Sequence, residues 1–130
     1  MLFVVLNSIF LHKALTKNDV MIYVKAVGLS YELSGAETGT NADIKISKGD
    51  VLTFELDVEG HPFWIKTENG TGKNNSVSSG ISGVGQGKTF GLLIWDTKEI
   101  MAGTYYYQCE FHPLMVGKII VRSKTPNNIM

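Results

Sequence analysis

The chain has few of the residues that stabilise small secreted domains or hold several metal ions. Its 130 residues include one cysteine and three histidines. A single cysteine cannot form an internal disulfide, so the fold does not depend on a disulfide framework, and cysteine usage does not reveal the redox compartment. A lone cysteine needs another explanation, and a bond to a metal ion is one.

An excess of charge and a long apolar run are also missing. Lys+Arg and Asp+Glu balance at 12 each, so net charge does not attract the chain to nucleic acid or to an anionic membrane. The apolar segment 1–11 is shorter than the about 20 residues that a membrane-spanning helix needs. It lacks a preceding basic residue and small cleavage residues, so a signal peptide and an apolar element packed on the domain both stay open. We interpret His12 as an ordinary surface histidine.

The length of the chain fits one domain with its own hydrophobic core. We expect residues 1–19 to form an apolar leader or N-terminal extension, residues 20–122 to form the folded domain, and residues 123–130 to form a polar tail.

What the sequence does contain is short β-forming stretches separated by glycine turns. Residues 43–47 and 51–58 alternate apolar and polar side chains with a period of two. No long helical periodicity appears, and 14 glycines indicate many turns. We therefore predict an all-β fold, a single antiparallel Greek-key β-sandwich of about seven or eight strands. Residues 67–88 form the longest irregular piece, interpreted as a mobile surface connection rather than a binding loop.

The only cysteine lies in a short turn between two predicted strands. Cys109 is followed by His112 and then Met115, each three positions further on. Strand-forming runs lie on both sides, so the chain must reverse direction here and the three side chains project from one tight loop. A thiolate, an imidazole and a thioether form a soft donor set that suits copper. A trigonal site needs a second imidazole, and His61 is the one good candidate upstream.

Each of these residues alone has a purely structural explanation. A free cysteine is most often a small buried hydrophobe, and a methionine near a strand usually fills the core. The joint pattern is more specific, because His61 precedes a Cys-x-x-His-x-x-Met motif near the C-terminus by 48 positions. We therefore predict a metal site formed by His61, Cys109, His112 and Met115.

The motif Gly60-His61-Pro62-Phe63 and the run from Tyr106 to Gly117 resemble a cupredoxin, or type 1 blue copper protein, of the plastocyanin/amicyanin type. The resemblance covers about residues 20–122, and the short Cys-x-x-His-x-x-Met spacing is most similar to amicyanin. It implies a cupredoxin-like sandwich holding one type 1 copper ion. By this resemblance His61, Cys109 and His112 are equatorial ligands and Met115 is a weak axial ligand.

The resemblance further implies a small mononuclear blue copper protein that shuttles single electrons between redox partners by Cu(I)/Cu(II) cycling. It would not be an enzyme, and no residue would be catalytic. Redox partners would dock transiently near His112, Pro113 and Leu114. We expect a monomer with no nucleic-acid partner and no membrane span. The family also implies an extracytoplasmic location, in the periplasm, in a lumen or membrane-associated through the N-terminal segment.

Other functions make different demands on the sequence. A copper carrier or chaperone could use the same ligand set, and it stays open because ligation alone does not distinguish storing copper from cycling it. A multicopper oxidase or nitrite reductase needs further histidine-rich sites, and only His12 remains after the ligands are assigned. A dinuclear copper site needs two cysteines in the loop. A metal-free binding sandwich is the last alternative.

Overall fold

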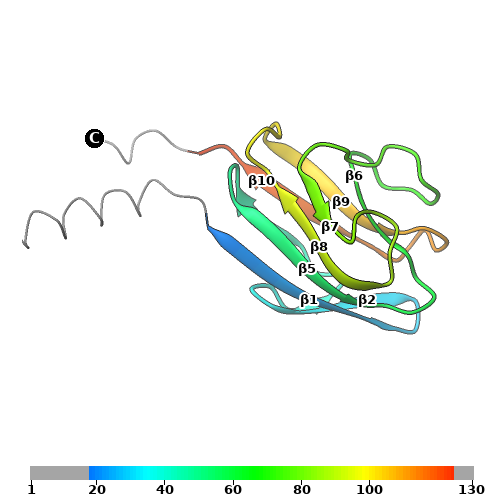
Figure 1. Cartoon of the computed structure of the whole chain (residues 1–130). Helices are drawn as coiled ribbons and strands as arrows, with labels where there is room; N and C mark the ends of the chain where they lie inside the picture. The colour runs from blue at the N-terminus through cyan, green and yellow to red at the C-terminus, as the bar shows by residue number, and fades with distance from the viewer. Residues whose placement is uncertain (1–17, 125–130) are drawn as a thin grey trace, which may run out of the picture.

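The fold is a two-layer arrangement of β-strands, described by a computed structural model for residues 18–124 (Figure 1). Residues 1–17 and 125–130, which include the apolar segment and His12, lie outside the described residues. The ten strands of the described part are β1 Asp19–Val27, β2 Ser30–Gly35, β3 Gly39–Thr40, β4 Ile44–Ser47, β5 Val51–Asp57, β6 Phe63–Lys66, β7 Ile81–Gly83, β8 Phe90–Asp96, β9 Gly103–Cys109 and β10 Val116–Arg122. The number exceeds the predicted seven or eight because β3 and β7 are only two and three residues long, too short for a periodic signal.

The strands form two sheets, which confirms the predicted all-β sandwich. One sheet has the order β3-β2-β1-β5-β8-β7 and the other has the order β4-β10-β9-β6. The expectation of purely antiparallel pairing was wrong, because β1 pairs with β5 and β10 pairs with β4 in parallel. Parallel neighbours need a connection that leaves the sheet and returns, and alternation within one strand does not encode the direction of its neighbour. No helix between residues 18 and 124 is long and apolar enough to span a membrane.

The core lies between the two sheets and is dominated by aromatic rings. Strand β5 places Leu52, Phe54 and Leu56 inward, as its alternating sequence predicts. Phe54 packs against Phe63 of β6 with ring centroids 4.8 Å apart, and Phe63 stacks on Tyr107 of β9 at 5.5 Å. These rings pack directly beneath the end of the sandwich where β9 finishes and β6 begins, so they give that end a rigid base.

The β5–β6 and β9–β10 connections lie at the same end of the sandwich, the right-hand end in Figure 1. The first connection is a tight turn in which the His61 amide donates to the Val58 carbonyl at 2.9 Å. Gly60 occupies this turn with φ +84°, a conformation that glycine adopts without strain. Both segments that carry predicted ligands are thereby brought to one end of the molecule.

Segment 67–80, within the longest predicted irregular piece, is attached to the domain by its backbone. Its Gly72 amide donates to the Glu110 carbonyl at 2.8 Å, and its Val77 amide donates to the Ile65 carbonyl at 2.9 Å. Val77 is 6% exposed and belongs to the core. The prediction of a surface connection is confirmed, because most residues of the segment are exposed, although Val77 is buried and the Gly72 and Val77 amides bond to residues outside the segment.

Candidate metal centre

Three of the four predicted ligands converge at the end of the sandwich. The candidate ligand atoms of His61, Cys109 and His112 all lie within 4.8 Å of one another. The Cys109 Sγ lies 3.6 Å from the His61 Nδ1 and 3.5 Å from the His112 Nδ1. The two imidazole ring centroids are 5.0 Å apart. The cluster therefore joins residues separated by 48 positions in the chain.

These separations fit a metal ion shared by the three side chains. A thiolate and an imidazole bind a first-row divalent metal at about 2.3 and 2.0 Å. With a trigonal angle of about 120° between the two bonds, the sulfur and nitrogen atoms come to lie about 3.7 Å apart. The observed distances of 3.6 and 3.5 Å are close to this value.

Cys109 is fixed by its place at the end of a central strand. It is the last residue of β9, it pairs with Phe63 of β6, and it is completely buried. Its backbone amide donates to the Met115 carbonyl at 2.9 Å, which closes the loop that carries the other ligands. The strand therefore sets the sulfur position before any metal binds.

Met115 also lies in this closed loop. Its amide donates to the His112 carbonyl at 3.2 Å, and its side chain is completely buried in the core. These bonds place the backbone of Met115 beside those of Cys109 and His112. A buried, polarisable thioether is suited to a weak axial contact with copper.

His61 is held by a buried tyrosine on the opposite sheet. The Tyr31 hydroxyl donates to the His61 carbonyl at 2.8 Å, and Tyr31 is completely buried. Burial raises the pKa of the Tyr31 hydroxyl far above its ordinary value, and the neighbouring Cys109 raises it further. Tyr31 is therefore a neutral hydroxyl donor over the whole physiological range of pH.

Two contacts of Glu110 tie the two ligand-bearing segments together. The Glu110 amide donates to the Pro62 carbonyl at 3.0 Å, and the Trp64 Nε1 donates to the Glu110 Oε1 at 2.8 Å. Sequence reasoning did not single out Trp64, Glu110 or Tyr31, because each takes its role from partners far away in sequence. No local motif could have identified them.

Gln108 is the most unexpected residue at this end. Alternation along β9 predicts that it faces away from the core side, opposite to Cys109 and Tyr107. Gln108 does occupy that face, yet it is completely buried because segment 67–80 covers it. The Gly70 amide of this segment donates to the Gln108 Oε1 at 3.0 Å. The Gln108 Nε2 donates to backbone carbonyls of the loop from Cys109 to Met115, which we call the ligand loop. The shortest of these distances, 2.9 Å, is to the His112 carbonyl oxygen.

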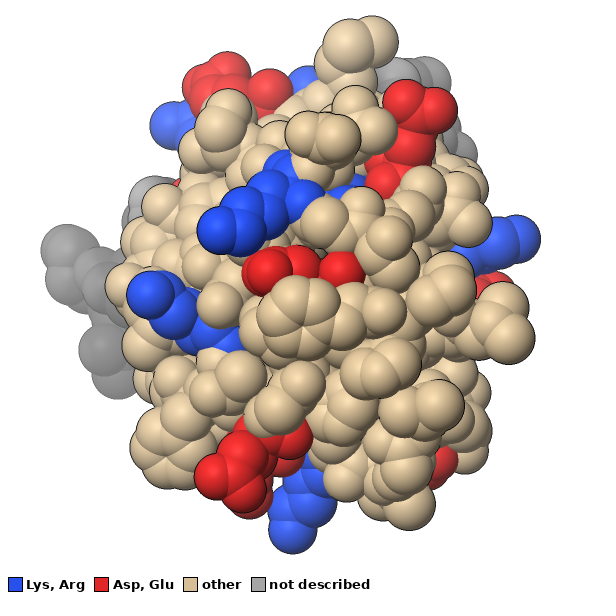
Figure 2. Space-filling model, turned by 90° about the vertical axis from the view of Figure 1, so that its right-hand side faces the viewer, with Lys and Arg blue, Asp and Glu red and all other residues tan. Residues whose placement is uncertain are grey.

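The surface around the cluster is apolar on the side of the ligand loop. Phe111 is 59% exposed, Leu114 is 86% exposed and Pro113 is also exposed. His61 and His112 are both half-buried, so neither is clearly the more accessible. Figure 2 shows the face at this end, where charged side chains are scattered and uncharged residues cover most of the area. Partner contact at this end would therefore bury mostly uncharged surface.

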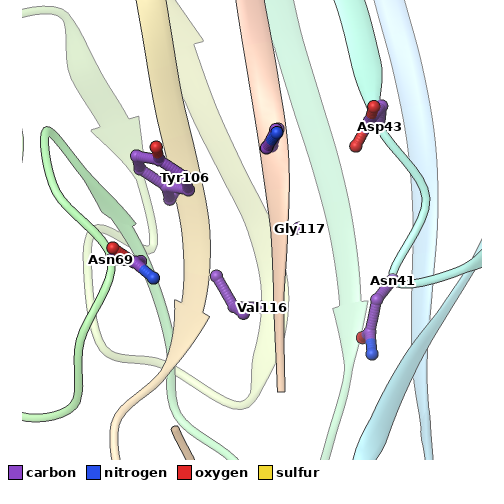
Figure 3. A pocket seen from close by; sticks show the side chains of 7 residues that line it. Asn41, Asp43, Asn69, Tyr106, Val116 and Gly117 are labelled. Carbon is purple, nitrogen blue, oxygen red and sulfur yellow. The ribbon is translucent and has the colours of Figure 1, made fainter. Parts of the chain in front are cut away.

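A pocket of about 210 Å³ lies elsewhere, on the outer face of β9 and β10. Figure 3 shows its lining, in which Tyr106, Val116 and Gly117 come from these strands and Asn69 comes from the segment beside β9. None of the candidate ligands lines this pocket. The pocket is therefore separate from the candidate metal cluster.

Comparison with known proteins places this fold. No protein-family model and no curated protein sequence matches the chain. A structure of rusticyanin from Thiobacillus ferrooxidans is 26% identical, covering 82% of this chain and 79% of that chain with a TM-score of 0.56. Reduced rusticyanin is 24% identical, covering 82% and 81% with the same TM-score. Rusticyanin is a copper protein. The chain therefore has a cupredoxin-like fold, and its His-Cys-His cluster fits a blue copper protein.

A Cu(I) form of an amicyanin variant is a more distant match to this chain, with 21% identity, coverage of 78% and 82%, and a TM-score of 0.45. The donor set in this chain fits a single type 1 copper ion, because one thiolate and two imidazoles are the strong ligands that such a site uses.

Proposed function

We propose that this cupredoxin binds one copper ion with His61, Cys109, His112 and Met115 and carries single electrons between redox proteins. The observation that carries the proposal is the convergence of one thiolate and two imidazoles within 4.8 Å at the end of a β-sandwich. Copper in such a site supplies a one-electron couple, Cu(I)/Cu(II), in a ligand geometry acceptable to both states.

The protein contributes rigidity to this chemistry. Cys109 is fixed by the β9–β6 pairing, and His61 is fixed by the Tyr31 hydroxyl bond. These contacts hold the backbone at each residue, so the backbone resists movement towards the geometric preference of either oxidation state. Burial of Cys109 and Met115 excludes water from the sulfur ligands. Small structural change on electron transfer is the expected result.

The exposed residues of the ligand loop suit transient contact with a partner. Phe111, Pro113 and Leu114 surround His112 with uncharged surface. Small apolar contacts of this kind are typical of redox encounters that must dissociate quickly. We propose that electrons pass through His112 to partners docked on this surface, that the protein acts as a monomer, and that it works outside the cytoplasm.

Copper delivery is the competing function for the same ligands. A carrier must give up its ion readily, whereas Cys109 and Met115 are completely buried and their loop is closed by backbone bonds. This burial favours a resident ion and therefore electron transfer. We do not propose an enzymatic activity.

Spectroscopy of copper-loaded protein tests the proposal. We expect an intense visible band from thiolate-to-copper charge transfer and the EPR signature of a type 1 centre. Cys109→Ser should lose the band. A colourless protein after addition of Cu(II) would refute the site. A reversible potential with fast self-exchange supports electron transfer, whereas rapid surrender of Cu(I) to a chelator supports delivery.

A further inference from the structure

The side chain of Gln108 contacts several backbone carbonyls of the ligand loop, and the pairing of β9 with its neighbours uses none of these contacts. Its Nε2 lies 2.9 Å from the His112 carbonyl oxygen and 3.1 Å from that of Cys109. Longer approaches of 3.4 and 3.5 Å reach the carbonyl oxygens of Met115 and Pro113. One buried amide thus faces the carbonyl groups of three proposed ligands.

The other end of the same amide faces away from the loop. Its Oε1 accepts the Gly70 amide at 3.0 Å. Because carbonyl oxygens need a donor and the Gly70 N–H needs an acceptor, these neighbours determine which atom of the amide is nitrogen and which is oxygen. Gln108 is therefore a bridge between segment 67–80 and the ligand loop.

Segment 67–80 is in turn fixed on both sides of this bridge. The Lys66 Nζ donates to the Gly70 carbonyl at 2.6 Å, and the Gly72 amide donates to the Glu110 carbonyl at 2.8 Å. Figure 3 shows the segment carrying Asn69 running beside β9. The segment therefore covers Gln108 and keeps water away from its amide.

We propose that Gln108 is a positioning residue that holds the loop of Cys109, His112 and Met115 in its metal-binding shape before copper enters. This inference rests on the proposed function. Residues that orient metal ligands through hydrogen bonds typically change metal affinity by about 10- to 100-fold when mutated. Gln108 acts on the ligands through their backbone carbonyls, and segment 67–80 anchors it against the sandwich.

The side chain at this position must donate to the loop carbonyls and accept from the Gly70 amide, and a primary amide on a side chain of glutamine length does both. Glutamate would place a buried negative charge against the carbonyl oxygens of Cys109 and His112. Methionine would keep the volume but leave the Gly70 amide and the loop carbonyls without partners. Asparagine would keep the amide on an arm one carbon shorter.

The chain supplies a matched control in Gln86. Its Oε1 accepts the Ile65 amide at 2.8 Å, and its Nε2 donates to the carbonyls of Ile65 and Val77, each at 2.9 Å. It bridges connection and strand as Gln108 does but contacts no proposed ligand. Gln108→Met and Gln86→Met therefore remove the same chemical group from two similar bridges, only one of which touches the ligand loop.

The experiment compares both variants with the wild type in metal-free and copper-loaded form. Deuterium exchange of metal-free protein should become faster in residues 109–116 for Gln108→Met, and not for Gln86→Met. Release of copper to a chelator should be about 10- to 100-fold faster for Gln108→Met only. Should Gln108→Met fail to fold, Gln108→Asn is measured in the same way and should give smaller changes of the same kind.

Equal behaviour of the two glutamine variants in both measurements would overturn the inference. A wild-type protein that binds no copper would remove the proposed function, but the exchange comparison in metal-free protein would still decide whether Gln108 orders the loop. Faster exchange in the loop without faster copper release would also contradict the proposal, because the loop order would then not serve the metal.

Discussion

At the scale of single residues, the site combines groups that differ in burial and in freedom to move. Cys109 and Met115 are completely buried, whereas His61 and His112 are half-buried. The two candidate sulfur ligands are therefore shielded from water, whereas the two candidate imidazole ligands are partly exposed to it. Such an arrangement protects the thiolate from oxidation and leaves an imidazole edge for contact with a partner.

Replacing Met115 separates the axial contact from the rest of the site. Met115→Leu conserves volume, so its free energy of unfolding should fall by less than about 1.5 kcal/mol. We expect copper to stay bound and the reduction potential to rise, because the axial thioether stabilises the oxidised ion. Voltammetry measures the potential. The control is Met101→Leu, at a residue 79% exposed and at the other end of β9; an equal shift in both variants would contradict an axial role.

At the scale of elements, the β9–β10 pair determines the site. Strand β9 ends at Cys109, and β10 begins directly after Met115, so the ligand loop is the connection between these antiparallel strands. Tyr107 pairs with Gly117 across the two strands, and its hydroxyl donates to the Ala42 carbonyl at 2.7 Å. A residue without a side chain opposite Tyr107 lets its ring lie against the backbone of β10 at Gly117.

Adding one methyl group to β10 tests this packing. A Cβ atom at Gly117 would collide with the Tyr107 ring, which is completely buried. We expect Gly117→Ala to lower the free energy of unfolding by about 1 to 3 kcal/mol, measured by urea denaturation. Lys118→Ala, at an exposed neighbour, should change it by less than about 0.5 kcal/mol. Similar values for the two variants would show that the ring can move aside.

Strand β6 carries a buried lysine whose ionisation is coupled to folding. Lys66 is 1% exposed, and burial lowers the pKa of its ammonium group, although Glu110 partly opposes the shift. The native state therefore loses this proton at a lower pH than the unfolded chain, whose lysines titrate near 10.4. The cost of burying the charge is present at neutral pH, and it is relieved as the pH rises from the native pKa towards the unfolded value.

The sign of this effect can be measured by mutation. Between neutral pH and about pH 10, the wild type should gain stability relative to Lys66→Met. Only the wild type has a buried ammonium group whose cost disappears when it loses its proton. Urea denaturation at several pH values gives the difference. Lys118→Met, at an exposed lysine, serves as control. If the stability of the wild type minus that of Lys66→Met stays constant or falls as the pH rises, the pKa of Lys66 is not lowered.

At the scale of the whole molecule, the sandwich separates its stable core from its proposed contact surface. The aromatic core lies between the sheets, and both ligand segments lie at one end (Figure 1). The formal net charge is zero, so long-range attraction does not select partners of one sign. Recognition would then depend on the shape and apolar character of the end around His112.

A charge placed on that end should slow partner reactions without altering the metal site. Leu114 is 86% exposed, so Leu114→Asp should leave the visible spectrum and the fold unchanged. We expect the rate of reduction by a protein partner to fall by about tenfold, as for a contact that contributes about 1.4 kcal/mol. Met101→Asp is the control at the opposite end of β9. If both variants react at the wild-type rate, partners do not dock on the ligand loop.

The sequence by itself determined the class of fold and the residues to consider as ligands. Alternation in residues 43–58 encodes strands because side-chain direction has a period of two, and Cys109, His112 and Met115 lie within one short turn. The role of all four residues as copper ligands stays a prediction. Strand direction, the short strands β3 and β7 and the burial of Gln108 were not encoded locally.

Only the tertiary structure decided how these parts meet. The approach of His61 to Cys109 and the covering of Gln108 by segment 67–80 depend on contacts between residues 38 to 48 positions apart. Local propensity does not predict such pairs, because their geometry results from the packing of two sheets. The sequence indicated the candidate donors, and the packing of the two sheets brought His61, Cys109 and His112 within 4.8 Å of one another.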